Sequence, residues 1–109
     1  MISFEQLQKL MLRYEPEIAF SVKGSEKFSF CWMGKMPDRV TKADVYWFGL
    51  TPDGNNAYDY STFEEMSAAQ VFDGSSLFER WNDVIILEID ACDPEERLQS
   101  YLDAMDRTD

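Results

Sequence analysis

Residues 43–50 read Ala-Asp-Val-Tyr-Trp-Phe-Gly-Leu, and this stretch decides the fold class. It is rich in aromatic and β-branched residues, which is typical of a β-strand. Successive strand residues point to opposite faces of a sheet, so Val45 and Trp47 share one face and Tyr46 and Phe48 share the other. Both faces are therefore partly apolar. We expect helices to cover one face, whereas the sequence does not identify what meets the other. Trp47 and Phe48 are both predicted to lie in the core.

Three further segments are predicted to be strands. Apolar residues alternate in residues 18–22 and again in 28–32, and the polar, glycine-containing segment 23–27 lies between them, which predicts an antiparallel pair. Residues 34–42 carry a proline and several polar side chains and are expected to form a loop. Residues 84–89, Val-Ile-Ile-Leu-Glu-Ile, are almost entirely apolar, which predicts a strand in the interior of the sheet.

Four segments carry the start signals of helices. Ser3, Ser61 or Thr62, and Ser76 can each cap a helix, because a Glu or Gln stands three residues after each of them. The two candidates Ser61 and Thr62 give competing registers for one helix. Residues 93–96, Asp-Pro-Glu-Glu, form the clearest start, with Asp as the N-cap and Pro as the first helical residue.

These segments follow the order α-β-β-β-α-α-β-α. A chain of 109 residues fits one domain, and a hydrophobic fraction of 45% excludes disorder caused by low hydrophobicity. We therefore predict a single α+β domain over residues 1–109. Its sheet should have about four mostly antiparallel strands, with the helices packed mainly on one face.

Several classes of chemistry lack their usual residues. The chain has no histidine, which removes Ser-His-Asp and Cys-His catalysis and the commonest metal ligand. Cys31 and Cys92 stand alone in the sequence and are expected to be free thiols. The five glycines are isolated, so no phosphate-binding loop is recognisable. We expect no cofactor and no metal.

The start of the chain and its hydropathy bear on its location. Residues 1–6 lack the basic and apolar regions of a signal peptide. No apolar run approaches the roughly 20 residues that a membrane-spanning helix needs. The expectation from the sequence is a cytoplasmic protein that does not bind membranes.

The charge of the chain lies almost entirely in its second half. Residues 1–50 hold seven basic and six acidic residues, a net charge of +1, whereas residues 51–109 hold three basic and fifteen acidic residues, a net charge of −12. A phosphate-binding face needs Lys and Arg, so direct binding of nucleic acid is not expected. A negative surface can steer a basic protein partner, although acidic charge also serves solubility.

The acidic half contains one segment in which acids alternate with tyrosines. Tyr is enriched at binding hot spots, and the turn at residues 51–54 should bring this segment to the surface. We therefore predict a small acidic non-enzymatic binding or inhibitory module that docks a protein partner, and the negative charge favours a partner with a basic surface. Its predicted contact residues are Asp53, Tyr58, Asp59, Tyr60, Glu64 and Glu65.

Two alternative functions stay open at this point. Glu88, Asp90 and Asp93 could form a carboxylate site of a metal-dependent enzyme, because alternation in a strand would place Glu88 and Asp90 on one face. The other alternative is a homodimeric structural subunit that associates through exposed apolar sheet surface.

Overall fold

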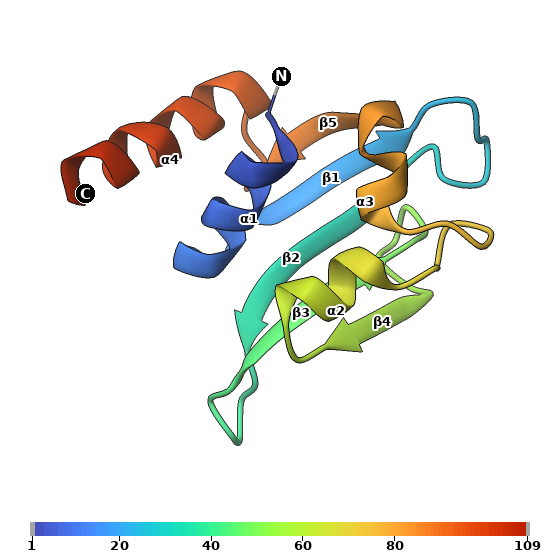
Figure 1. Ribbon diagram of the computed structural model, residues 1–109, viewed down its shortest axis with the longest axis horizontal. Coiled ribbons are helices and arrows are strands. Elements are labelled where there is room, and N and C mark those ends of the chain that lie inside the picture. The colour runs from blue at the N-terminus through green and yellow to red at the C-terminus, as the bar shows by residue number, and fades with distance from the viewer. Residues whose placement is uncertain (1, 109) are drawn as a thin grey trace.

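A five-stranded antiparallel sheet organises residues 2–108, the part of the chain that the computed structural model describes (Figure 1). The strand order is β4-β3-β2-β1-β5, so β2 lies at the centre and β4 and β5 form the two edges. The strands are β1 (Glu17–Val22), β2 (Cys31–Pro37), β3 (Asp44–Gly49), β4 (Ala57–Tyr60) and β5 (Val84–Ile89).

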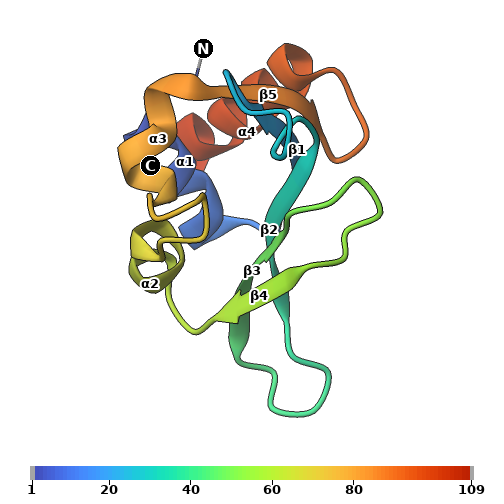
Figure 2. The same ribbon diagram turned by 90° about the vertical axis from the view of Figure 1, so that its right-hand side faces the viewer.

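Helices cover one face of this sheet, and no helix covers the other face, as the side view in Figure 2 shows. Three helices lie on the covered face, and a fourth packs at the β5 end of the molecule. The predicted α+β class, with helices mainly on one face, is confirmed. The helices are α1 (Phe4–Arg13), α2 (Phe63–Ala68), α3 (Leu77–Arg80), which continues into the 3-10 turn η1 (Trp81–Asp83), and α4 (Pro94–Thr108).

The helices begin where the capping signals place them. Ser3 and Ser76 form complete capping boxes at the starts of α1 and α3. Of the two candidate N-caps of α2, Ser61 and Thr62, the structure shows Thr62 in this position, because its hydroxyl accepts a hydrogen bond from the Glu65 N–H. Asp93 accepts a hydrogen bond from the Glu96 N–H and caps α4, as predicted.

The core lies between the covered face of the sheet and the helices. Alternate residues of each strand point into it, among them Phe20 of β1 and Phe48 of β3, both fully buried. Phe72, in the segment between α2 and α3, packs edge-to-face against Phe20, Phe28 and Phe48, with ring centroids 5.2 to 6.1 Å apart. Cys31 also lies in this core, and it and Cys92 are free thiols. Burial raises the pKa of the Cys31 thiol to about 11.

The second strand differs from its prediction. β2 begins at Cys31 and continues to Pro37, so residues 34–37 are strand and the loop after β1 is longer than expected. Lys35 consequently points to the helices. It is only 6% exposed, and its Nζ donates to the Leu12 carbonyl at the end of α1. The negative end of the helix dipole stabilises the positive charge of this amine. A search for alternating apolar residues could not predict that a lysine would take this inward-facing strand position.

Two further strand predictions need correction. The sequence misses β4, a four-residue strand that follows the 51–56 turn and gives the sheet its fifth strand. Residues 84–89 form an edge strand and not an interior one, and Ile85 there is 48% exposed. β5 is nevertheless almost entirely apolar, because Val84, Ile86 and Ile89 pack in or against the core and because β5 also contacts α4. The helices within residues 2–108 are too short or too polar to cross a membrane.

Candidate binding site: the open sheet face

The sheet face without helices, which we call the open face, is lined by side chains from all five strands. The strand register assigns residues to it, because directly paired residues of antiparallel strands point to the same side. Its members are Glu17, Ala19 and Ser21 of β1; Trp32, Gly34 and Met36 of β2; Val45, Trp47 and Gly49 of β3; Ala57 and Asp59 of β4; and Ile85 and Glu88 of β5.

Trp47 belongs to this face and not to the core, which corrects its prediction. Val45 and Trp47 do share a face, as expected, and Phe48 is in the core, but the face of Trp47 is the one that no helix covers. Trp47 is partly exposed as a result. The sequence could not decide this, because a tryptophan fits both a core and a binding surface.

One row of residues across four strands sets a carboxylate on each side of Trp47. Asp59 of β4 is paired with Trp47, which is paired with Gly34 of β2, which is paired with Glu17 of β1. A Cβ atom on Gly34 would lie 2.8 Å from Cζ2 of Trp47, so the indole lies over this glycine. The missing side chain at Gly34 thus gives the indole its place on the sheet.

The second tryptophan fixes the loop between β3 and β4 to the sheet. The Trp32 indole Nε1 donates to the Pro52 carbonyl at 3.0 Å, and its ring packs edge-to-face against Phe30 at 5.5 Å. Trp32 is paired with Gly49, and a Cβ atom there would lie 2.5 Å from the Gly54 carbonyl oxygen. The loop therefore sits directly on the sheet.

Asp53 stiffens this loop from within. Its carboxylate accepts hydrogen bonds from the Thr51 hydroxyl, at 2.5 Å, and from the backbone and side chain of Asn55. The hydrogen bond from Thr51, followed by that from the Asn55 N–H, lowers the pKa of Asp53. The carboxylate is exposed and stays ionised at neutral pH.

Between the loop and the tryptophans lies an open groove of about 390 Å³. Its lining combines indole rings, a thioether, backbone and two carboxylates, and it includes no Lys or Arg. The lining residues are Glu17, Trp32, Met36, Trp47, Pro52, Asp53 and Gly54.

The open face is acidic as a whole. Its strand positions include Glu17, Asp59 and Glu88 but no basic residue, and no hydrogen bond or ion pair within residues 2–108 occupies these three carboxylates. Aromatic rings beside unpaired carboxylates are the chemistry that receives a cationic group from another molecule.

The structure divides the six predicted contact residues between two sides of the molecule. Asp53 and Asp59 reach the open face, as described. Tyr58 and Tyr60 pair with Phe48 and Tyr46 and so point to the helix side, where Tyr58 is 38% exposed and Tyr60 packs against the core. The remaining two, Glu64 and Glu65, are exposed on α2, also on the helix side.

Six of the seven groove residues were absent from the predicted site: Glu17, Trp32, Met36, Trp47, Pro52 and Gly54. A signal did exist for the two residues from β2, because Trp32, Gly34 and Met36 stand at alternate positions. A glycine inside a strand often marks a close approach of other atoms, which at Gly34 is the Trp47 ring.

The three carboxylates of the alternative metal site do not come together. β5 ends at Ile89, and Asp90 adopts a left-handed conformation with φ of 54°, so the alternation with Glu88 does not reach it. Asp93 caps α4. No group of three His, Cys, Asp or Glu side chains that could hold a metal occurs within residues 2–108.

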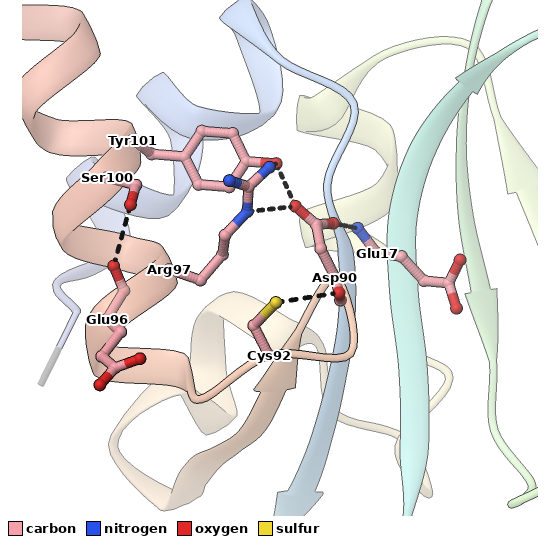
Figure 3. A network of polar contacts seen from close by, with 7 residues as sticks. All are labelled: Glu17, Asp90, Cys92, Glu96, Arg97, Ser100 and Tyr101. Atoms are coloured by element: carbon pink, nitrogen blue, oxygen red, sulfur yellow. Dashed lines mark hydrogen bonds and ion pairs between the residues drawn. The ribbon is translucent and has the colours of Figure 1, made fainter.

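Asp90 instead joins α4 to the start of β1, as Figure 3 shows. Its carboxylate accepts hydrogen bonds from the Glu17 N–H at 2.9 Å, from Arg97 Nε at 2.8 Å and from the Tyr101 hydroxyl. Burial opposes ionisation of Asp90, but these hydrogen bonds outweigh it and lower the pKa. Burial and the bond to Asp90 raise the pKa of Tyr101 to about 12. The Glu17 carboxylate points away from this network (Figure 3).

A second groove, of about 250 Å³, lies beside the exposed edge of β5. It is almost entirely apolar and runs between β5 and the start of α4. Its lining residues are Ile2, Val84, Ile85, Ile86, Ile89, Pro94, Glu95 and Leu98.

The comparisons with known proteins give no further guide to the class of this domain. No family model, no curated protein and no solved structure matches the chain. Its function must therefore be inferred from the open face and the two grooves.

Proposed function

We propose that this protein is a small non-enzymatic binding or inhibitory module that docks a protein partner with a basic surface. The open face is the docking surface. The observation that carries this proposal is the row Asp59, Trp47, Gly34 and Glu17, which presents an indole between unpaired carboxylates on a face that no helix covers.

Two physical arguments support this surface over the rest of the molecule. Tryptophan is enriched among the residues that dominate binding energy, and both open-face tryptophans are held in place by contacts with glycine or loop backbone. A surface that is ordered before binding loses less entropy when the partner arrives. The net charge of −11 would also attract a basic partner over a distance.

Affinity capture followed by mass spectrometry tests the proposal. The bait proteins are the wild type, a Glu17→Gln/Asp59→Asn variant of the open face, and a Glu64→Gln/Glu65→Gln variant of α2. Both variants remove two negative charges, but from opposite sides of the molecule. The long hydrogen bond of 3.5 Å that the Glu64 carboxylate accepts from Gln8 Nε2 can also be accepted by the amide oxygen of the Gln variant. The proposal expects the wild type and the α2 variant to retain a basic partner that the open-face variant loses.

Salt provides the second arm of this experiment. Screening weakens attraction between exposed charges, so capture should decline as the salt concentration rises. Equal loss of the partner by both variants, or capture that salt leaves unchanged, would argue against docking through the open face.

The edge of β5 favours a second candidate function, a homodimer. An exposed apolar edge strand has a row of backbone groups free to pair with a strand of another molecule, and Ile85 with the neighbouring groove adds apolar surface. Two copies would then extend one sheet across both molecules.

Light scattering tests the homodimer. A dimer gives twice the monomer mass of 12.7 kDa, and Ile85→Lys should restore the monomer by placing a charge at the edge. Because both copies are acidic, salt should strengthen this association, the opposite of its effect on a basic partner. A monomer mass at every salt and protein concentration would exclude this candidate.

A further inference from the structure

Given docking through the open face, we propose that the groove beside Trp47 binds the side chain of one arginine of the partner protein. The inference rests on the proposed function and names the group that the groove recognises.

The lining of the groove matches a guanidinium group. A cation over the face of an indole is attracted by the π-electrons, and arginine makes this contact more often than lysine. Trp47 and Trp32 supply indoles, and Met36 supplies an apolar contact for the alkyl stem. A lysine ammonium would fit less well, because it is compact, strongly hydrated and unable to stack.

The two carboxylates of the groove have different parts in this recognition. The Asp53 carboxylate is occupied by Thr51 and Asn55, so it contributes negative charge while it holds the loop in place. No hydrogen bond or ion pair within residues 2–108 occupies the Glu17 carboxylate, which Figure 3 shows turned away from Asp90. Glu17 is therefore the group free to form the paired hydrogen bonds that a guanidinium makes with a carboxylate.

No basic residue in the lining of the groove neutralises its carboxylates. The lining contains no Lys or Arg. Lys35, on the same strand as Trp32 and Met36, points to the opposite side of the sheet and is bonded to Leu12. The cation must therefore come from another molecule.

Nuclear magnetic resonance of the three tryptophan indole N–H groups tests this inference. Trp32 and Trp47 line the groove, whereas the Trp81 indole is buried on the helix side and donates to the Ile2 carbonyl. Trp81 thus serves as an internal control. The probe is the capped tripeptide Gly-Arg-Gly, and its control is the same peptide with citrulline, which has nearly the same shape but no charge.

The arginine peptide should shift the Trp32 and Trp47 signals in a saturable way and leave the Trp81 signal in place. The citrulline peptide should shift none, and a Gly-Lys-Gly peptide should bind more weakly. Glu17→Gln should weaken arginine binding by about tenfold, because a charged hydrogen-bonding partner is lost, whereas Glu65→Gln on α2 should not change it.

Three results would overturn the assignment: equal shifts with citrulline, equal affinity for lysine, or unchanged affinity in Glu17→Gln. The capture experiment separates this failure from failure of the proposed function. If the peptide does not bind but capture still depends on Glu17 and Asp59, the docking face stands and the arginine site is wrong. If the peptide binds but capture ignores the open face, docking through this face is wrong.

Discussion

Gly34 is the residue on which the open face depends most directly. It stands between Trp47 and Glu17 in the sheet, and the Pro16 carbonyl oxygen would lie 2.4 Å from a Cβ atom placed there. Backbone cannot yield as easily as the end of a flexible side chain. The same glycine that interrupts the apolar pattern of the sequence is therefore the one that seats the indole.

Replacing this glycine tests the packing. Gly34→Ala should reduce the free energy of unfolding by about 2 kcal/mol, because overpacking a tight site displaces neighbouring atoms. It should also change the fluorescence of the displaced Trp47. Ser21→Ala, on the same face of β1, is the control and should stay within about 0.5 kcal/mol of the wild type in urea unfolding. An alanine variant as stable as the wild type would mean that the contact is not tight.

At the scale of helices and strands, the sequence predicts where a helix begins better than it predicts which strands lie side by side in the sheet. Caps such as Ser3, Ser76 and Asp93 are local hydrogen bonds between residues three apart, so their pattern is legible in one short segment. The edge position of β5 depends instead on pairing with β1, more than 60 residues away in the chain. Such a partner leaves no local signal.

The candidate site shows the same limit. Asp53 and Asp59 could be predicted as contact residues, because the turn and the acidic segment that contain them are neighbours in the chain. Glu17 and Trp32 reach the same face only through strand register, which follows from the whole sheet. Residues 34–37 of β2 were predicted to be a loop, because they include a glycine and a proline. The alternate positions of Trp32, Gly34 and Met36 were nevertheless a sign of a strand.

The assignment of Thr62 as the N-cap of α2 can be tested by substitution. Thr62→Ala should cost about 1 kcal/mol of stability, because it removes the hydroxyl that accepts from the Glu65 N–H. Ser61→Ala is the matched control and should have little effect, since Ser61 is outside the capping position. Urea unfolding of the two variants decides between the registers, and a larger loss for Ser61→Ala would contradict the structure.

The attachment of α4 should depend on pH through Asp90. Because its pKa is lower in the folded state than in the unfolded chain, ionised Asp90 stabilises the fold above pH about 4, and this contribution is lost as pH falls through the folded pKa. Asp90→Asn should lose about 2 kcal/mol at pH 7 and show a shallower decline in acid.

Urea unfolding at a series of pH values measures both effects. Asp59→Asn is the control, since its carboxylate makes no hydrogen bond within residues 2–108 and its removal should leave stability at pH 7 nearly unchanged. Parallel pH profiles for the wild type and Asp90→Asn would show that the network of Asp90, Arg97 and Tyr101 does not contribute as its hydrogen bonds suggest.

At the scale of the whole molecule, the fold explains where the acidic charge can act. Part of it serves local structure: Glu79 completes a cap, Asp93 begins α4 and Asp90 anchors that helix. Glu17, Asp59 and Glu88 have no such task within residues 2–108 and share the open face. Glu17 belongs to the nearly neutral first half of the chain, so charge counted along the sequence understates this surface.

The most direct test of docking through the open face is the dissociation constant of the captured partner, measured across a series of salt concentrations. The wild type is compared with Glu17→Gln/Asp59→Asn and with Glu64→Gln/Glu65→Gln, which have equal net charge. We expect the open-face variant to bind at least tenfold more weakly than the α2 variant at low salt, with a flatter dependence on salt, because it has lost charges that contact the partner. Identical constants and identical salt dependence for the two variants would contradict docking through the open face.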